Sequence, residues 1–173
     1  PKVEHIFIAP GNGGTQSPKS SNVDLQVTDI SNLLQFALDK GIDLTIVGPE
    51  EPLALGIVNH FQQAGLKIFG PNRTAARLES SKAFAKNFMR FYKIPTADFN
   101  IFTLNQVKEA EKYVEALNKP VVVKAHGLAA GKGVLICNTV TEAKQAISRI
   151  LVDLEFGEAG KQIVIEEKLL GKE

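Results

Sequence analysis

Short apolar runs alternate with amphipathic helical patterns through the first half of the chain. The runs are rich in β-branched and aromatic residues and end at Gly or Pro, which is typical of strands followed by turns. Strands are predicted at 3–9, 44–47 and 67–69, helices at 30–41 and 53–64, and a polar loop at 16–23. Strands separated by helices in this rhythm predict a parallel, doubly wound α/β sheet, whose ligands sit at the carboxyl ends of the strands.

The second half combines helices with strands of antiparallel hairpin character, so an α+β domain is expected. A helix is predicted from Thr74 to Tyr92, with an apolar face of Ala83, Phe84, Phe88 and Phe91, and Pro95 ends it. The other helices are predicted at 104–117 and at 141–154 with Thr141 as N-cap, and the strands at 99–102, 120–123, 134–137 and 163–165. We expect two domains, residues 1–76 and 77–173.

Composition narrows the classes of function. The 173 residues carry 20 Lys plus Arg and 19 Asp plus Glu, so there is no excess positive field for a nucleic-acid backbone or an anionic membrane. No apolar run approaches the roughly 20 residues that span a bilayer. Cys137 is the one cysteine, which excludes an internal disulfide or cysteine metal cluster and favours the cytoplasm. We predict that Cys137 is a buried small residue.

The three histidines indicate neither a metal site nor a catalytic triad. His5, His60 and His126 lack metal-ligand spacing, and no Ser-His-Asp or Cys-His arrangement is recognisable. We interpret His5 and His60 as structural or surface residues. Any chemistry is therefore expected to depend on other segments.

A glycine-rich segment, Lys124 to Gly133, lies between two predicted strands. Its glycines at 127, 131 and 133 let backbone amides approach a ligand closely, and Lys124 and Lys132 supply charges for phosphate oxygens. A Walker A loop is excluded, because Gly133 stands where that motif needs Ser or Thr, and a strand follows instead of a helix. The alternative is a hairpin whose lysines keep it soluble.

Three further segments have a binding interpretation and a structural one. Residues 165–173 begin in a buried strand and continue as a polar segment. Such a segment could bind adenine and ribose, or it could be an edge strand followed by a charged turn. The loop 10–15 offers amides and the Thr15 hydroxyl to a phosphate, or is a plain turn. Glu50 and Glu51 follow a strand, where they would hold hydroxyls or an amine, or simply begin a helix.

Taken together, these segments resemble the phosphoribosylamine–glycine ligase (glycinamide ribonucleotide synthetase) family of ATP-grasp enzymes. The resemblance covers nearly the whole chain and keeps the family order. It implies a Rossmann-like, parallel-sheet N-terminal (pre-ATP-grasp) domain followed by the first part of an α+β ATP-grasp domain. The matching segments are residues 9–15, 43–50 with Pro52-Leu53, 68–71, 78–84, 93–97, 124–134 and 164–167.

The resemblance implies a role for particular residues. Lys82 and Lys124 match lysines that contact ATP phosphates, and residues 127–133 match the loop that closes over them. The implied ATP-binding residues are Lys82, Lys124, Gly127, Ala130, Gly131, Lys132 and Gly133, with Glu166, Glu167 and Leu169 beside adenine and Glu173 at the ribose. On the phosphoribosylamine side the implied residues are Asn12, Gly13, Thr15 and Glu50.

The implied reaction joins glycine to 5-phosphoribosylamine at the expense of ATP, through a glycyl phosphate. No protein nucleophile is needed, since lysines, amides and a metal position and neutralise the reactants. The cofactor is ATP with Mg²⁺ or Mn²⁺, whose ligands are expected beyond Glu173. The chain is expected to be an inactive fragment that lacks a first strand and everything after Glu173. Neither nucleic acid nor membrane is an expected partner, and fusion to other purine-pathway enzymes is left open.

The sequence departs from the family at a few positions. His126 stands where Asp or a small polar residue is usual, and Lys168 and Lys172 replace the usual Phe and acidic residue. Lys168 is expected to alter the packing under adenine. Two alternatives to the ligase remain: another ATP-grasp ligase or carboxylase, and a non-catalytic nucleotide-binding module.

Overall fold

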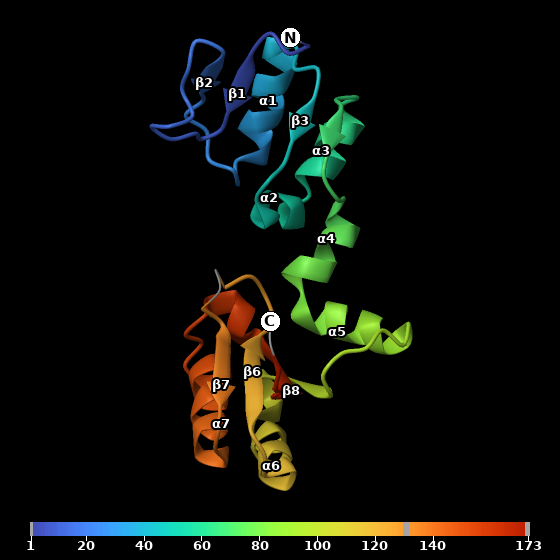
Figure 1. Cartoon of the computed structure of the whole chain (residues 1–173), viewed down its shortest axis with the longest axis vertical. Helices are drawn as coiled ribbons and strands as arrows, with labels where there is room; N and C mark the ends of the chain where they lie inside the picture. Colours follow the sequence, from blue (N-terminus) through green and yellow to red (C-terminus); the bar gives the residue numbers. More distant parts are fainter. Residues whose placement is uncertain (1, 130–131, 172–173) are drawn as a thin grey trace. The chain divides into compact units, whose positions relative to one another are not determined.

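The protein consists of two compact units. The computed structural model describes residues 2–129 and 132–171, and Figure 1 shows the order of helices and strands. The units comprise residues 1–76 and 77–173, and the helix α4 (Arg73–Ser80) contains the boundary between them. Each unit is described by itself.

Unit 1 is built from two short pairs of parallel strands and three helices. The strand β1 (Ile6–Ile8) pairs with β2 (Ser20–Asn22), and β3 (Thr45–Ile46) pairs with β4 (Ile68–Phe69). The helices are α1 (Ile30–Lys40), α2 (Glu50–Leu55) and α3 (Ile57–Gln63). The predicted parallel α/β character is confirmed. The prediction of a loop at 16–23 is wrong at β2, whose polar sequence Ser-Ser-Asn gives no strand signal.

Local signals explain where the helices of unit 1 begin and end. Asp29 caps α1, because its carboxylate accepts a hydrogen bond from the Asn32 amide at 3.2 Å. The helix ends at Gly41 in the left-handed conformation. The single helix predicted at 53–64 is in fact two, since Gly56 adopts a φ of 92° between α2 and α3. Leu53, Ile57, Val58 and Phe61 from these helices form the core of the unit with Ala37 and Ala76.

Unit 2 contains a four-stranded sheet in the order β5-β8-β6-β7, in which every neighbouring pair is antiparallel. This confirms the predicted α+β character. The strands are β5 (Phe99–Thr103), β6 (Val121–Ala125), β7 (Val134–Cys137) and β8 (Gln162–Glu167). The helices are α5 (Lys82–Phe91), α6 (Val107–Leu117) and α7 (Val140–Ile147), with short 3-10 turns η1 (Leu104–Gln106) and η3 (Gly157–Lys161) and a π-helical turn η2 (Ser148–Val152).

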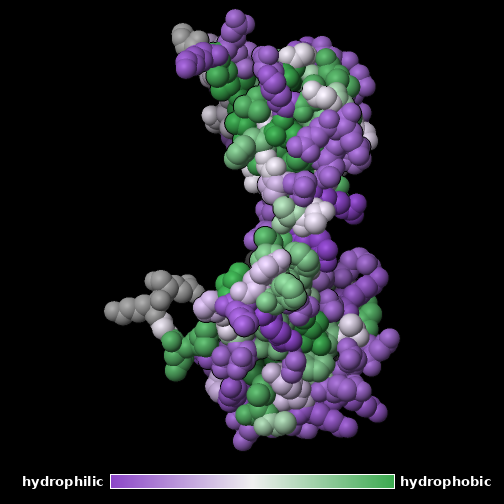
Figure 2. Space-filling model, turned by 90° about the vertical axis from the view of Figure 1, so that its right-hand side faces the viewer, coloured by the Kyte–Doolittle hydropathy of each residue, from purple (hydrophilic) through white to green (hydrophobic). Residues whose placement is uncertain are grey.

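Helices cover both faces of this sheet. On one face, α6 and α7 pack against it in a core that contains Ile147, Ile163 and Ile165. On the other face, Ala83 of α5 packs against Phe99 of β5 and Val164 of β8. Cys137 is 2% exposed within the first core, as predicted. The outer surface is mainly hydrophilic in the view of Figure 2, with hydrophobic residues between.

Three details of the helices in unit 2 correct the predictions. The helix expected from Thr74 to Tyr92 is interrupted, because Ser81 caps a new helix by accepting from the Phe84 amide at 3.1 Å. Its expected apolar face is wrong at Phe91, which is 78% exposed. The N-cap of α7 is Thr139 and not Thr141, since the Thr139 hydroxyl accepts from the Glu142 amide at 3.2 Å.

Within residues 2–129 and 132–171, no helix is long and apolar enough to cross a bilayer.

Candidate functional site

Strand pairing brings Lys124 and Glu166 together on one face of the sheet of unit 2. Alternate residues of β6 and β8, among them Val123 and Ile165, point into the core under α6 and α7. Lys124 and Glu166 each adjoin such a residue, so their side chains point to the opposite face. The register pairs Lys124 with Val164, which makes Lys124 and Glu166 diagonal neighbours. Their Nζ and Oε2 atoms are 3.0 Å apart.

The helix α5 adds two more lysines to this face. Lys82 and Lys86 are one turn apart, and residues at that spacing lie on the same side of a helix. The Lys82 amide donates to the His126 carbonyl at 2.9 Å, and its Nζ donates to the Gly127 carbonyl at 3.0 Å. These two bonds attach the first turn of α5 to the segment that follows β6.

Lys86 lies deeper than Lys82, and its ammonium group is fully engaged. Its Nζ donates to Thr96 Oγ1 at 2.6 Å and to the Ala97 carbonyl at 3.0 Å. The same nitrogen lies 3.5 Å from Glu166 Oε2 and 4.9 Å from the centre of the Phe99 ring. Lys86 is therefore a buried cation with an oxygen partner for each of its three N–H groups.

The cluster of Lys82, Lys86, Lys124 and Glu166 (the lysine cluster) carries more positive than negative charge. Two ammonium groups, of Lys86 and Lys124, adjoin the buried Glu166 carboxylate, and the third, of Lys82, donates to the Gly127 carbonyl. Burial lowers the pKa of Lys82, and the charge of Lys124 lowers it further. Burial likewise lowers the pKa of Lys86, against the opposing effect of Glu166. Repulsion among cations is relieved by an anion, so this face suits a ligand with several negative charges.

The glycine-rich segment borders the lysine cluster. A Cβ atom added at Gly133 would lie 2.7 Å from Ala129 Cβ, and one added at Gly127 would lie 3.0 Å from Ala159 Cβ. At Gly133 a side chain would force a neighbour to shift, and at Gly127 it would be tight, so packing within the chain itself favours glycine at both positions. Lys132 is exposed. Ala130 and Gly131, both predicted site residues, lie outside the described residues.

His126 occupies the first position of this segment after β6. Its amide donates to the carbonyls of Ala159 and Gln162, at 3.0 and 2.9 Å. Its Nδ1 atom is buried without a hydrogen-bond partner among the described residues. Burial lowers the pKa of His126, and the charges of Lys82 and Arg77 lower it further. The neutral imidazole is therefore favoured at this site.

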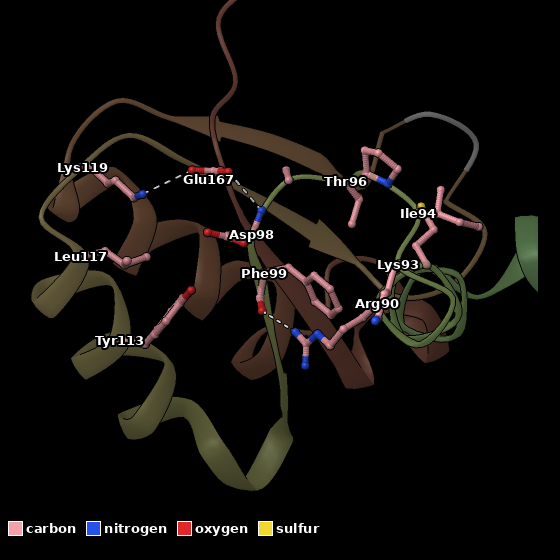
Figure 3. Close-up of a pocket in the computed structure, with 13 residues that line it drawn as sticks. Arg90, Lys93, Ile94, Thr96, Asp98, Phe99, Tyr113, Leu117, Lys119 and Glu167 are labelled. Carbon is pink, nitrogen blue, oxygen red and sulfur yellow. Dashed lines mark hydrogen bonds and ion pairs between the residues drawn. The ribbon is translucent and has the colours of Figure 1, made fainter.

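Glu167 points away from the lysine cluster, because it alternates with Glu166 along β8. Its carboxylate accepts from the Asp98 amide at 3.1 Å and lies 3.4 Å from Lys119 Nζ, as Figure 3 shows. The Asp98 hydrogen bond and then Lys119 lower the pKa of Glu167. The side chain lines a cavity of about 470 Å³, which Thr96 and Ala97 also line. Only the backbone of Glu167 is therefore in a position to contact a ligand beside Glu166.

The remaining predicted residues of this half lie at the end of the chain. Leu169 is 67% exposed, and Glu173 lies outside the described residues. Among residues 2–129 and 132–171, no group of three His, Cys, Asp or Glu side chains is arranged to hold a metal ion. The described residues thus suit an anion with several charges and do not fit a metal centre.

In unit 1 the loop after β1 is held together by its own side chains. The Asn12 amide donates to Thr15 Oγ1 at 2.7 Å, and the Gly14 amide donates to Asn12 Oδ1 at 2.8 Å. Asn22 Nδ2 donates to the Asn12 carbonyl at 2.8 Å. Gly13 is exposed. The polar side chains predicted to face a substrate are therefore already engaged within the loop.

Glu50 and Glu51 both lie in the first turn of α2, where they are exposed. Carboxylates are favoured at this position, because the first amides of a helix carry partial positive charge. Their position in the fold is therefore explained by the favourable start of a helix, without a ligand.

Sequence reasoning did not identify Lys86, Thr96 or Asn22. Lys86 follows Lys82 at helical spacing, which is a weak signal for a shared face. Lysines are almost never buried unless they are paired. The sequence does not show that Glu166 is the partner, so it does not predict that Lys86 is buried. Asn22 lies in the strand that was taken for a loop.

A parallel α/β unit, an antiparallel sheet and a lysine cluster beside a glycine-rich segment define an ATP-grasp protein. The solved phosphoribosylamine–glycine ligase from Thermotoga maritima has a TM-score of 0.73 at 29% identity, over 97% of this chain and 39% of that chain. D-alanine–D-alanine ligase from Bacillus anthracis has the same fold, with a TM-score of 0.65 at 20% identity, over 88% of this chain and 47% of that one.

The particular family follows from sequence comparison. Residues 1–79 match the model of the phosphoribosylglycinamide synthetase N domain, and residues 80–173 match that of its ATP-grasp (A) domain. The chain therefore belongs to the phosphoribosylglycinamide synthetase family, which confirms the resemblance. The phosphoribosylamine–glycine ligases of Vibrio vulnificus strain YJ016 and Escherichia coli K12 are each 53% identical over 174 aligned positions. The alignments cover 100% of this chain and 40% of the length of each relative.

Proposed function

We propose that the full-length protein joins glycine to 5-phosphoribosylamine to give glycinamide ribonucleotide, ADP and phosphate. The glycine carboxylate attacks the γ-phosphorus of ATP, and ADP leaves. The amine of phosphoribosylamine then attacks the acyl carbon of glycyl phosphate, phosphate leaves with the bonding electrons, and the amine loses a proton. Support comes from family membership over the whole chain and from relatives that bear the name of this activity.

The observation that carries the proposal is the surplus positive charge of the lysine cluster. In our proposal Lys82 and Lys124 hold phosphate oxygens, because charge-assisted hydrogen bonds to phosphate are about twice as strong as neutral ones. Lys132 and the amides of the glycine-rich segment contact the same group. Positioning and charge neutralisation suffice for this chemistry, which needs no protein nucleophile.

The nucleoside is assigned to the end of β8. Because the Glu166 carboxylate is paired with Lys86 and Lys124, the backbone at Glu166, Glu167 and Leu169 would meet the edge of the adenine ring. Glu173 is assigned to the ribose. Lys168, whose Nζ donates to Asn138 Oδ1 at 2.8 Å, would pack beside the base.

Phosphoribosylamine is assigned to unit 1. The loops with Asn12, Gly13, Thr15 and Glu50 follow the carboxyl ends of β1 and β3, where ligands of parallel α/β sheets bind. Because Asn12 and Thr15 hydrogen-bond within their own loop, the backbone of Gly13 is the part offered to a phosphate.

Mg²⁺ or Mn²⁺ is proposed to accompany ATP, with ligands outside the described residues. When bound, the metal neutralises phosphate charge. A cytoplasmic location is proposed from the single cysteine and from the absence of a bilayer-spanning helix within the described residues.

The test is ADP release by the full-length protein at saturating ATP, with glycine and phosphoribosylamine together and with each omitted. We expect release only when both are present. Release that is indifferent to both would contradict the ligase. Tight ATP binding without turnover would indicate a nucleotide-binding module instead, and turnover with a different acid would indicate another ATP-grasp enzyme.

A further inference from the structure

One carboxylate oxygen of Glu166 is shared between two lysines of different exposure. Lys124 Nζ lies 3.0 Å and Lys86 Nζ lies 3.5 Å from Oε2. The exposed fractions of the side chains are 27% for Lys124, 7% for Lys86 and 10% for Glu166. The two lysines therefore compete for the same atom, one from the rim of the cluster and one from its interior.

Lys86 is fixed in place by partners other than Glu166. Two of its three N–H groups bind Thr96 Oγ1 and the Ala97 carbonyl, both in the segment between α5 and β5. Its nitrogen also lies over the Phe99 ring, at 4.9 Å from the ring centre, where a cation is attracted by the π electrons. Lys86 thus has no freedom to follow a ligand.

Lys124 has Glu166 as its only hydrogen-bonded partner among the described residues. A lysine that moves from this carboxylate to a phosphate would ordinarily leave a buried charge unpaired, which is strongly unfavourable. Lys86 removes that cost, because it remains beside Glu166 after Lys124 has left.

We infer that Lys86 is a positioning residue for ATP: it is the standing counter-ion of Glu166 that frees Lys124 to bind phosphate. The inference rests on the proposed use of Lys124 for phosphate. Lys86 then strengthens the binding of the phosphates, through Glu166 and Lys124. It does not affect the binding of the nucleoside.

The experiment compares Kd for ATP with Kd for adenosine in the full-length protein by calorimetry. Lys86→Met keeps an unbranched side chain that is one atom shorter and removes the charge. We expect Kd for ATP to rise about tenfold or more, because Glu166 then retains Lys124, while Kd for adenosine changes less than about threefold. Lys86→Arg, which keeps the charge, should retain the wild-type ratio of the two constants.

The double variant Lys86→Met/Glu166→Gln separates this mechanism from a loss of structure. With the carboxylate gone, Lys124 has nothing to hold it, so the ratio should equal that of Glu166→Gln alone within about threefold. This comparison remains valid even where Lys86→Met alone fails to fold.

Two outcomes would overturn the inference: an equal loss of affinity for ATP and adenosine in Lys86→Met, or a tenfold difference between the double variant and Glu166→Gln. Wild-type ADP release with both substrates tests the ligase separately, so that failure of the ligase and failure of the Lys86 role are distinguishable.

Discussion

The two glycine-rich loops of this chain are alike in sequence and differ in what surrounds them. In unit 1, residues 10–15 use their polar side chains to bind one another and Asn22. In unit 2, the segment 124–133 begins with Lys124, which shares the buried Glu166 carboxylate with Lys86, and the Gly127 carbonyl accepts from Lys82 Nζ. Each loop has glycines in close contact with the rest of the chain, Gly11 in the first and Gly127 and Gly133 in the second, so glycine content does not distinguish the two. A surplus of charge distinguishes the loop that suits an anion.

Replacing Lys124 by alanine should give the largest effect on ligand binding. We expect Kd for ATP to rise more than tenfold, because a charge-assisted contact in a partly desolvated site contributes about 1.5–3 kcal/mol. Calorimetric titration of the full-length protein measures this. Lys144→Ala, which removes an exposed lysine paired with Glu115, is the matched control and should bind ATP as the wild type does. An unchanged Kd in Lys124→Ala would remove the distinction between the loops.

Gly11→Ala should give the largest effect on stability. Gly11 has a φ of 75°, and its added Cβ would lie 2.2 Å from Asn22 Oδ1, so the side chain that holds the loop must move. We expect a loss of about 2 kcal/mol or more in the free energy of unfolding, measured in urea. Gly13→Ala, whose Cβ meets nothing within 4 Å, should change it by about 0.5 kcal/mol or less. Equal losses in the two variants would contradict the role of Asn22.

Thr15→Val separates stability from ATP binding in the first loop. The Thr15 hydroxyl accepts from the Asn12 amide at 2.7 Å and lies 2.7 Å from Asn22 Oδ1. Its loss should cost about 1 kcal/mol of unfolding free energy and leave Kd for ATP within about twofold. A tenfold weaker affinity for ATP would show that this loop, too, takes part in nucleotide binding.

Lowering the pH should decrease the free energy of unfolding slightly, through His126 in the second loop. Burial, Lys82 and Arg77 hold the pKa of His126 below its ordinary value of 6.5. As the pH falls through 6.5, the unfolded chain therefore takes up a proton that the folded chain does not yet accept, and stability decreases. Between about pH 7.5 and 5.5 the wild type should lose more unfolding free energy than His126→Gln. Identical losses would contradict a buried, neutral His126.

The alternation of strands and helices made the fold class predictable from the sequence. Errors arose where a single residue overrides a periodic pattern. Gly56 and Ser81 each divide what the apolar spacing presents as one helix, the first through its positive φ and the second by capping. The strand β2 was missed because its stability comes from pairing with β1 and not from its own side chains.

The sequence predicts some residues of the candidate site. It does not predict the buried Lys86, which is paired with Glu166. The resemblance predicts Lys82 and Lys124 as phosphate ligands, and in the structure Lys124 Nζ donates to Glu166 Oε2 and Lys82 Nζ donates to the Gly127 carbonyl. The burial of Lys86 depends on Glu166, Thr96 and Phe99. No local pattern encodes such a contact between distant segments, because only the completed sheet brings these residues together.

In our proposal the lysine cluster recognises the phosphates of a nucleotide. The most direct test is the Kd of the wild-type, full-length protein for ATP and for AMP under the same conditions. We expect ATP to bind at least about tenfold more tightly than AMP, because the added phosphates gain charge-assisted contacts. Equal affinities for the two nucleotides would contradict it.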